Sequence, residues 1–174
     1  MKEKGGTRAH AARFSHLGEG AGARMVDTGA KAVTLRSARA EAVVFLGASI
    51  ARRLARKGGL AKGGVCEVAR VAGILAAKRT AELIPLCHPL PLDHVEVTCA
   101  LGRDRLTLAA SARCRGRTGV EMEALVAAAV AALTVYDMCK SAGKGILIER
   151  VRLLEKTGGK SGEWRAPRTP GGRS

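Results

Sequence analysis

The segment from Glu123 to Cys139 constrains the fold of this chain more than any other, because it is rich in alanine and apolar on almost every side. Its longest apolar stretch, Ala124–Val135, is too short to cross a bilayer and is typical of a buried helix. Aromatic residues make up only 2% of the chain, so alanine, valine and leucine must fill the core. Such small side chains favour close packing of helices on a sheet.

The segments on both sides of this helix have the alternation of β-strands. Between 95 and 99, apolar and polar residues alternate, and after a turn at 102–104 the alternation resumes from 105 to 113. This pattern predicts an antiparallel hairpin with one covered face. A closing strand is expected at 146–154, after the helix.

The first half of the chain adds strands and shorter helices. Two short strands are expected at 31–36 and 39–46, and a basic helix at 49–57. A longer helix at 65–83 precedes "IPLCHPLPL" at 84–92, whose prolines impose an extended, rigid backbone. This order of elements predicts an α+β fold with helices on one face of an antiparallel sheet.

The length of 174 residues suits one domain, which we expect at 25–162. Residues 1–24 are expected to form a flexible basic arm and residues 163–174 a flexible tail. The five cysteines include no CxxC pair, and the N-terminus lacks the apolar core of a signal peptide. We therefore expect a cytoplasmic protein with reduced thiols and no membrane anchor.

The net charge of +15 indicates an anionic partner, since 30 Lys and Arg stand against 15 Asp and Glu. Nucleic acid, an anionic membrane and a phosphorylated small molecule all fit this charge. The scarcity of aromatic side chains for base stacking makes nucleic acid the weaker choice. A basic nucleic-acid-binding protein stays as the alternative.

Asp137 and Lys140 continue the apolar stripe of the long helix, one turn apart. Their spacing is compatible with an ordinary ion pair at a helix end. It is equally compatible with a partly desolvated acid and base at the edge of a cleft.

Glu121 and Glu123 stand two residues apart in "TGVEMEAL". On an extended approach to the helix they would point the same way, and within a helix they would diverge by about 200°. Two carboxylates on one face could share proton transfer. Acids are also favoured in the first turn of any helix, and the residues alone favour this second interpretation.

His88 lies between Cys87 and Pro89 in the rigid segment. A histidine on a stiff loop suits a positioned hydrogen-bond donor or proton carrier, and a satisfied surface histidine fits equally well. The Cys-His dipeptide lacks further ligands at zinc spacing, so no metal site is predicted.

Two glycine-rich turns carry lysines. Lys62 precedes two glycines and a helix, a context that could bind phosphate but more often is a basic loop. "TGGKSG" at 157–162 resembles the end of a P-loop but lacks its first glycine and its helix. Phosphate binding by Lys160 stays open, whereas nucleotide hydrolysis of the P-loop type is excluded.

Four blocks, from about Ser15 to Gly162, resemble the cyclic pyranopterin monophosphate synthases, the second enzymes of molybdenum cofactor biosynthesis. They are "ARMVDTGAK", "ARVAGILAAKRTAELIPLCHPLPL", "TGVEMEALVAAAVAALTVYDMCK" and "VRLLEKTGGKSG". The stretch 47–61, with its additional arginines, departs from the family pattern.

The resemblance implies a ferredoxin-like subunit in a homohexamer, a trimer of dimers with sites at subunit interfaces. It implies a lyase that converts 3′,8-cyclo-7,8-dihydroguanosine 5′-triphosphate to cyclic pyranopterin monophosphate with release of pyrophosphate. No redox cofactor is implied, because the preceding radical enzyme makes the substrate, and magnesium on the triphosphate stays open.

The resemblance also assigns residues. It places catalytic roles on Asp137, Lys140 and Lys62. It places substrate contacts on Leu86, Cys87, His88, Glu121, Met122 and Glu123.

Overall fold

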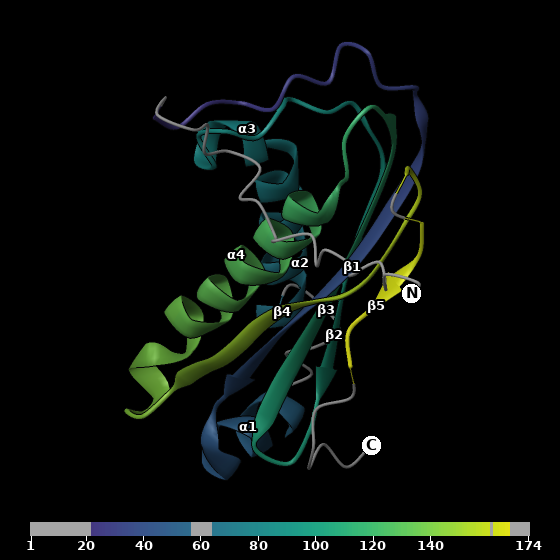
Figure 1. Ribbon diagram of the computed structural model, residues 1–174. Helices are drawn as coiled ribbons and strands as arrows, with labels where there is room; N and C mark the ends of the chain where they lie inside the picture. The colour runs from purple at the N-terminus through teal and green to yellow at the C-terminus, as the bar shows by residue number, and fades with distance from the viewer. Residues whose placement is uncertain (1–21, 57–63, 161, 168–174) are drawn as a thin grey trace, which may run out of the picture.

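The computed structural model describes residues 22–56, 64–160 and 162–167, in which helices cover one face of a five-stranded antiparallel sheet (Figure 1). The strands lie in the order β2-β3-β1-β4-β5. Their bounds are Thr34–Phe45 (β1), Leu92–Leu101 (β2), Arg105–Gly116 (β3), Leu147–Thr157 (β4) and Trp164–Arg165 (β5). The helices are Gly47–Arg56 (α1), Val65–Lys78 (α2), Thr80–Leu83 (α3) and Glu121–Cys139 (α4), followed by the 3-10 turn Lys140–Ala142 (η1).

The chain order β1-α2-β2-β3-α4-β4, with β1 and β3 central, is a ferredoxin-like topology. All four strand pairs are antiparallel. The α+β prediction is thus confirmed. Helix α1 lies at the end of the sheet opposite α3 (Figure 1), and β5 adds a short edge strand.

The core lies between the sheet and the two long helices. Strand β3 sends alternate side chains toward the helices, and these are almost fully buried: Leu106, Leu108, Ala110, Ala112 and Cys114. Alanines of α4 fill the opposite side, so the helix packs closely on the sheet. Gly73 of α2 lets the two helices approach, because a Cβ there would lie 2.8 Å from the carbonyl oxygen of Ala127.

Strand β1 is continuous, so the prediction of two strands at 31–36 and 39–46 is wrong. Ser37 and Ala38, at the expected break, pair with Arg113 and Ala112 of β3 without interruption. The segment contains no glycine, proline or asparagine that would form a turn. Strand β1 therefore runs without a break along the whole length of β3.

The single helix expected at 65–83 is two helices, with the break at Arg79. The backbone of Arg79 (φ −109°, ψ 14°) leaves the helical region, and its N–H bonds to the carbonyl of Ala76. The hydroxyl of Thr80 donates to the carbonyl of Ala77 at 2.9 Å. This local side-chain bond competes with continuation of the helix.

The ends of the chain lie largely outside the described residues. Of the predicted basic arm, only 22–24 is described. Within the predicted tail from 163 onward, Trp164 and Arg165 form β5 and pair with Lys156 and Glu155 of β4, a strand that the sequence analysis did not predict.

One helical run, Glu121–Ala142, is long and apolar enough to cross a membrane by length and composition alone. This run is longer than the apolar stretch judged from the sequence. Its alanine face is packed on the sheet, with Ala124, Ala127 and Ala131 at 0% exposure. Such burial is typical of the core helix of a water-soluble fold.

Candidate functional site

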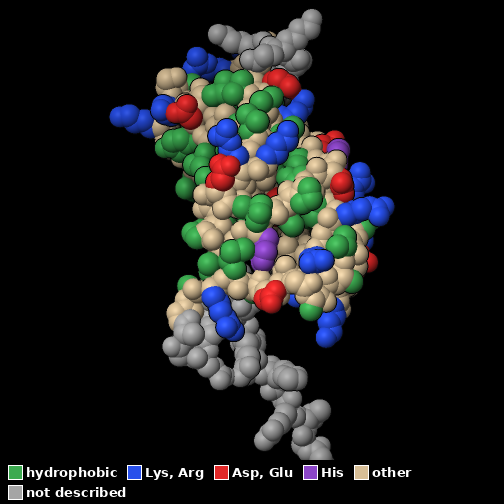
Figure 2. Space-filling view, turned by 90° about the horizontal axis from the view of Figure 1, so that it is seen from above, with side chains coloured by type: hydrophobic (Ala, Val, Ile, Leu, Met, Phe, Trp, Pro, Cys, Tyr) green, Lys and Arg blue, Asp and Glu red, His purple; other side chains and the backbone are tan. Residues whose placement is uncertain are grey.

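A cavity of about 320 Å³ opens at the N-terminal end of α4. Figure 2 views this end of the molecule, where basic side chains are scattered among apolar ones. The cavity is lined by all six residues predicted to contact substrate: Leu86, Cys87, His88, Glu121, Met122 and Glu123. The structure therefore brings together two blocks that are more than thirty residues apart in the chain.

The rigid segment presents Leu86, Cys87 and His88 to this cavity. Helix α3 ends before Ile84, whose extended backbone (φ −113°, ψ 105°) is the conformation favoured before Pro85. A turn follows, in which the N–H of Cys87 bonds to the carbonyl of Ile84 at 3.0 Å. The predicted extended segment at 84–92 therefore begins with a turn instead, residues 87–91 have no regular secondary structure, and β2 starts at Leu92.

Glu121 and Glu123 lie inside the first turn of α4, which begins two residues earlier than expected. The two carboxylates therefore diverge around the helix, as a helical spacing of two requires. Glu121 faces the cavity mouth, where its Oε1 accepts a hydrogen bond from Lys156 Nζ at 2.8 Å. Glu123 points inward and is only 4% exposed.

Burial raises the pKa of Glu123 to about 7, and the charge of Glu121 adds to this effect. Its carboxyl also lines a third cavity of about 140 Å³, together with Lys78 and Arg79 from the end of α2. Glu123 thus lies between two cavities and titrates close to neutral pH. A carboxyl with this pKa can both donate and accept a proton at pH 7.

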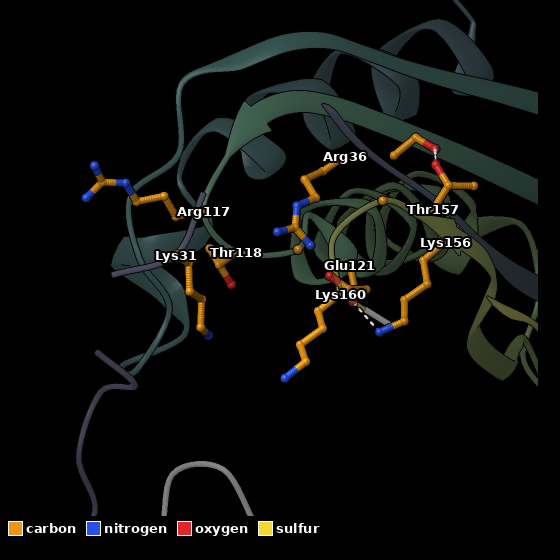
Figure 3. Close-up of a pocket in the computed structure, with 11 residues that line it drawn as sticks. Lys31, Arg36, Arg117, Thr118, Glu121, Lys156, Thr157 and Lys160 are labelled. Carbon is orange, nitrogen blue, oxygen red and sulfur yellow. Dashed lines mark hydrogen bonds and ion pairs between the residues drawn. The ribbon is translucent and has the colours of Figure 1, made fainter. Parts of the chain in front are cut away.

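A larger cavity of about 580 Å³ adjoins the first and is strongly cationic. The two cavities share Lys31, Thr118, Gly119 and Glu121, so they form one continuous depression. The basic residues that line the larger one are Lys31, Arg36, Arg117, Lys156 and Lys160. In Figure 3, Arg36, Lys156 and Lys160 gather around Glu121, whereas Arg117 points away from them.

The sheet topology explains this gathering of charge. Arg36 of β1 and Lys156 of β4 stand on the helix-bearing face of the sheet, opposite Cys114 and Ala38 respectively. Helix α4 begins at Glu121, so the ends of these strands extend beyond the helix that covers the rest of that face. Side chains that would otherwise be buried are therefore open to a ligand.

The turn after β4 fits tightly against Arg36. Gly158 and Gly159 have φ values of +94° and +72°, in the region that favours glycine. A Cβ on Gly159 would collide with the guanidinium of Arg36, and one on Gly158 with the carbonyl oxygen of Leu35. The Nε of Arg36 is buried and without a hydrogen-bond partner among the described residues. The "TGGKSG" turn therefore positions an arginine as well as Lys160.

Four cations of this depression were not predicted from the sequence: Lys31, Arg36, Arg117 and Lys156. Three of them stand in or beside the quoted blocks, but nothing in their spacing distinguishes them from solvated surface charges. Only strand pairing brings Arg36 and Lys156 to the same end of the sheet, although they are 120 residues apart.

Asp137 and Lys140 lie at the opposite end of α4. Lys140 Nζ donates to Asp137 Oδ1 at 2.6 Å, and the side chains of Asp137 and Lys140 are 70% and 62% exposed. This hydrogen bond raises the pKa of Lys140. Within one chain the two residues form an exposed ion pair, the first of the two interpretations of their spacing, because the outer face of α4 is uncovered at this end.

Sixteen residues separate Asp137 from Glu121, about 24 Å along a helix. One chain therefore does not bring the predicted catalytic pair to the depression. Lys62 lies outside the described residues. Among the residues with described positions, no three His, Cys, Asp or Glu side chains gather in a way that would hold a metal ion.

The fold and this depression define a class: a ferredoxin-like α+β protein with a cationic cavity beside a smaller cavity lined by carboxylates. Residues 25–159 match the model of the MoaC family. The chain belongs to this family.

The relatives cover nearly the whole chain. The chain is 54% identical over 157 residues to "Cyclic pyranopterin monophosphate synthase 3" of Mycobacterium tuberculosis (strain ATCC 25618 / H37Rv), which covers 90% of this chain and 88% of the relative. It is 54% identical over 158 residues to the cyclic pyranopterin monophosphate synthase of Chloroflexus aurantiacus (strain ATCC 29366 / DSM 635 / J-10-fl), covering 89% and 96%. It is 56% identical over 154 residues to that of Bordetella petrii, covering 87% and 94%.

Proposed function

We propose that this protein is a cyclic pyranopterin monophosphate synthase, which converts 3′,8-cyclo-7,8-dihydroguanosine 5′-triphosphate to cyclic pyranopterin monophosphate and releases pyrophosphate. The observation that carries the proposal is the pair of adjoining cavities, one cationic and one lined by carboxylates and His88. A substrate with a triphosphate at one end and a purine-derived ring at the other matches this division of charge.

The cationic cavity supports binding of the triphosphate. Lys31, Arg36 and Lys160 offer charged donors, and Lys156 is already oriented by its ion pair with Glu121. Arginine and lysine side chains hold phosphate oxygens through charge-assisted hydrogen bonds. The same charges stabilise the pyrophosphate as it leaves.

The smaller cavity supports binding of the ring. Glu121 and His88 both line this cavity, and Glu121 accepts a hydrogen bond from Lys156. Glu123 lines it too and has a pKa of about 7. These groups suit the amide and amine groups of a guanine-like ring. A single proton-transfer group of this kind contributes typically ~10²–10⁴ in rate.

Asp137, Lys140 and Lys62 complete the site in our proposal, supplied by a second copy of the chain. The separation of about 24 Å along α4 argues for this, since a straight helix cannot bring both of its ends to one substrate. We accordingly propose a homohexamer, built as a trimer of dimers, with each site between two chains. Asp137 relays protons during ring opening and closure, and the two lysines stabilise developing negative charge.

The reaction as proposed is a redistribution of bonds without net oxidation, so it needs no redox cofactor. In this proposal the preceding radical enzyme of the pathway supplies the unstable substrate, and the reaction takes place in the cytoplasm. Magnesium accompanying the triphosphate is tested by assaying turnover with and without chelator.

Turnover of the cyclic dihydroguanosine triphosphate under anaerobic conditions tests the proposal directly. Pyrophosphate and the pterin product should form together. Folded protein that forms neither from verified substrate would contradict the proposal. Binding of nucleic acid that weakens steeply with salt, without any turnover, would favour the alternative function.

Complementation between two inactive variants tests the shared site. Asp137→Asn and Lys156→Ala chains each have little activity alone when substrate is kept well below the wild-type KM. Under this condition they should regain about a quarter of wild-type activity when mixed as monomers and reassembled, because half of the dimers are mixed and each has one intact site. Mixtures of either variant with itself are the controls. A site contained in one chain would give no recovery.

A further inference from the structure

Cys66 and Cys99 meet where the first turn of α2 packs on β2. Cys99 Sγ donates a hydrogen bond to the carbonyl oxygen of Cys66 at 3.8 Å. Cys66 is 2% exposed, whereas Cys99 is only partly buried. Neither thiol lines the cavities at the N-terminal end of α4. The pair is therefore separate from the site described above.

The surroundings of Cys66 favour its thiolate. The thiol of Cys99 is within hydrogen-bonding reach and lowers the pKa of Cys66, helped by the charge of Arg70, while burial and Glu67 act against it. Arg70 is fixed close by, since its Nε donates to the carbonyl of Val97 at 3.2 Å. Cys66 is also the second residue of α2, where exposed N–H groups stabilise negative charge.

Cys99 is the complementary member of the pair. Its hydrogen bond to Cys66, burial and the charge of Cys66 all raise its pKa, so it keeps its proton. A thiol of lowered pKa beside a thiol that keeps its proton is the arrangement in which one sulfur reacts with an oxidant and the other resolves the product.

We propose that Cys66 and Cys99 are an oxidation site, at which hydrogen peroxide or a similarly small peroxide produces a reversible disulfide within one chain. The bond would link the start of α2 covalently to the edge strand of the sheet.

The chemistry balances in two steps. The Cys66 thiolate attacks one peroxide oxygen, the O–O bond breaks, and Cys66 becomes a sulfenic acid while the second oxygen leaves as hydroxide. The hydroxide takes up the proton that the Cys66 thiol released and becomes water. The Cys99 sulfur then attacks the Cys66 sulfur, the S–S bond forms, the S–O bond breaks, and hydroxide leaves with the Cys99 proton as a second water. Two thiols and one peroxide thus give one disulfide and two waters, with two electrons transferred to the peroxide.

Cys99 is a better resolving thiol than Cys139, the third thiol of this region. Burial raises the pKa of Cys139, and the charge of Cys66 adds to this effect. Cys139 is 3% exposed and makes no hydrogen bond to Cys66 within the described part of the chain, whereas Cys99 is hydrogen-bonded to Cys66 and lies nearer the surface. A small oxidant reaches the pair through the partly exposed side of Cys99.

Peptide mapping after peroxide treatment tests the proposal. Reduced full-length protein is treated with hydrogen peroxide, blocked with iodoacetamide and digested with trypsin and Asp-N, which cuts before Asp93 and so separates Cys99 from Cys87. We expect a linked pair of peptides, 63–70 with 93–103, and its loss after dithiothreitol. Linkage of Cys66 to Cys139, linkage only between chains, or no linkage while other thiols oxidise would overturn the proposal.

Two variants identify the reacting sulfur. In Cys99→Ser the sulfenic acid has no resolving partner, so dimedone should label Cys66 at least tenfold more than in the wild type. In Cys114→Ser, a matched loss of a buried thiol on β3, the disulfide should form at the wild-type rate. Dimedone labelling of Cys66 that is the same in Cys99→Ser and wild type would contradict the assigned roles.

Discussion

Glu121, the first residue of α4, is paired with Lys156 near the end of β4 at 2.8 Å, across the boundary between the two cavities. Both side chains are only about a third exposed or less, at 26% and 31%. The pair orients a carboxylate toward the smaller cavity and a cation toward the larger one. It therefore links the end of the site assigned to the ring with the end assigned to the phosphates.

Replacing Lys156 by alanine should raise KM for the triphosphate by about 10- to 100-fold, because a hydrogen bond between a cation and a phosphate is lost. Lys156→Arg should recover part of this loss. Steady-state kinetics would measure both. Arg103→Ala removes an exposed cation from the β2–β3 turn, at the far end of the sheet, and should leave KM unchanged. An equal effect of both alanine variants would indicate general charge attraction instead of a specific contact.

Gly159→Ala should raise KM for the triphosphate, because the new Cβ displaces the guanidinium of Arg36. The positive φ also costs about 1 kcal/mol of folding stability for a residue with a side chain. Gly162→Ala is the matched control, since its φ of +65° imposes similar strain but its Cβ would meet open space. Both variants should lose similar stability in urea unfolding, and only Gly159→Ala should lose affinity.

The stability of the protein should depend on pH through Glu123, whose pKa is raised from 4.5 to about 7 by burial. Between these values the folded state holds a proton that the unfolded state releases. Stability is therefore greatest below the unfolded pKa and is lost as pH rises through the folded pKa. Relative to Glu123→Gln, the wild type should lose roughly 2–3 kcal/mol of unfolding free energy between pH 4.5 and 7.5. Parallel pH profiles of the two proteins would show that Glu123 is not protonated at neutral pH.

Asp137→Asn should lower kcat by about 10²–10⁴ with little effect on stability. Its ion pair with Lys140 is exposed to solvent, so it contributes little to folding stability. Glu163→Gln removes a similarly exposed pair with Arg165 and should change neither kcat nor thermal midpoint. Turnover near the wild-type rate in folded Asp137→Asn protein would refute the role given to this residue.

Local patterns in the sequence predicted most of the elements. Alternation of apolar and polar residues identified β2 and β3, because it indicates a strand with one buried face. The apolar alanine-rich run identified α4, because it indicates a helix buried on most of its sides. The predicted bounds were wrong where tertiary or side-chain contacts determine the start or end of an element. Strand β1 was divided in two because its pairing with β3 holds Ser37 and Ala38 extended, and α2 was extended past Arg79 because a side-chain bond from Thr80 ends it.

The candidate site was predicted only in part. Residues of the two motif blocks do line one cavity, since each block is short and its members stay together whatever the fold. Arg36, Lys156 and Lys31 were missed because their side chains are ordinary surface cations until the sheet aligns the ends of β1 and β4. The exposure of Asp137 could not be predicted either. A stripe of residues along one side of a helix does not show how much of that side is packed against other elements.

The sequence by itself determined most of the elements, the family and the residue types of the site, because these depend on local periodicity and on short motifs. Only the tertiary structure decided that Glu121 meets Lys156, that Glu123 is buried enough to hold its proton near pH 7, and that Asp137 and Lys140 lie at the opposite end of α4. Each of these depends on strands distant in the chain lying side by side and on where a helix begins relative to the sheet. The physical reason is that the burial of a side chain and its distance from other charges depend on how segments pack together. The sequence of any one segment does not contain this information.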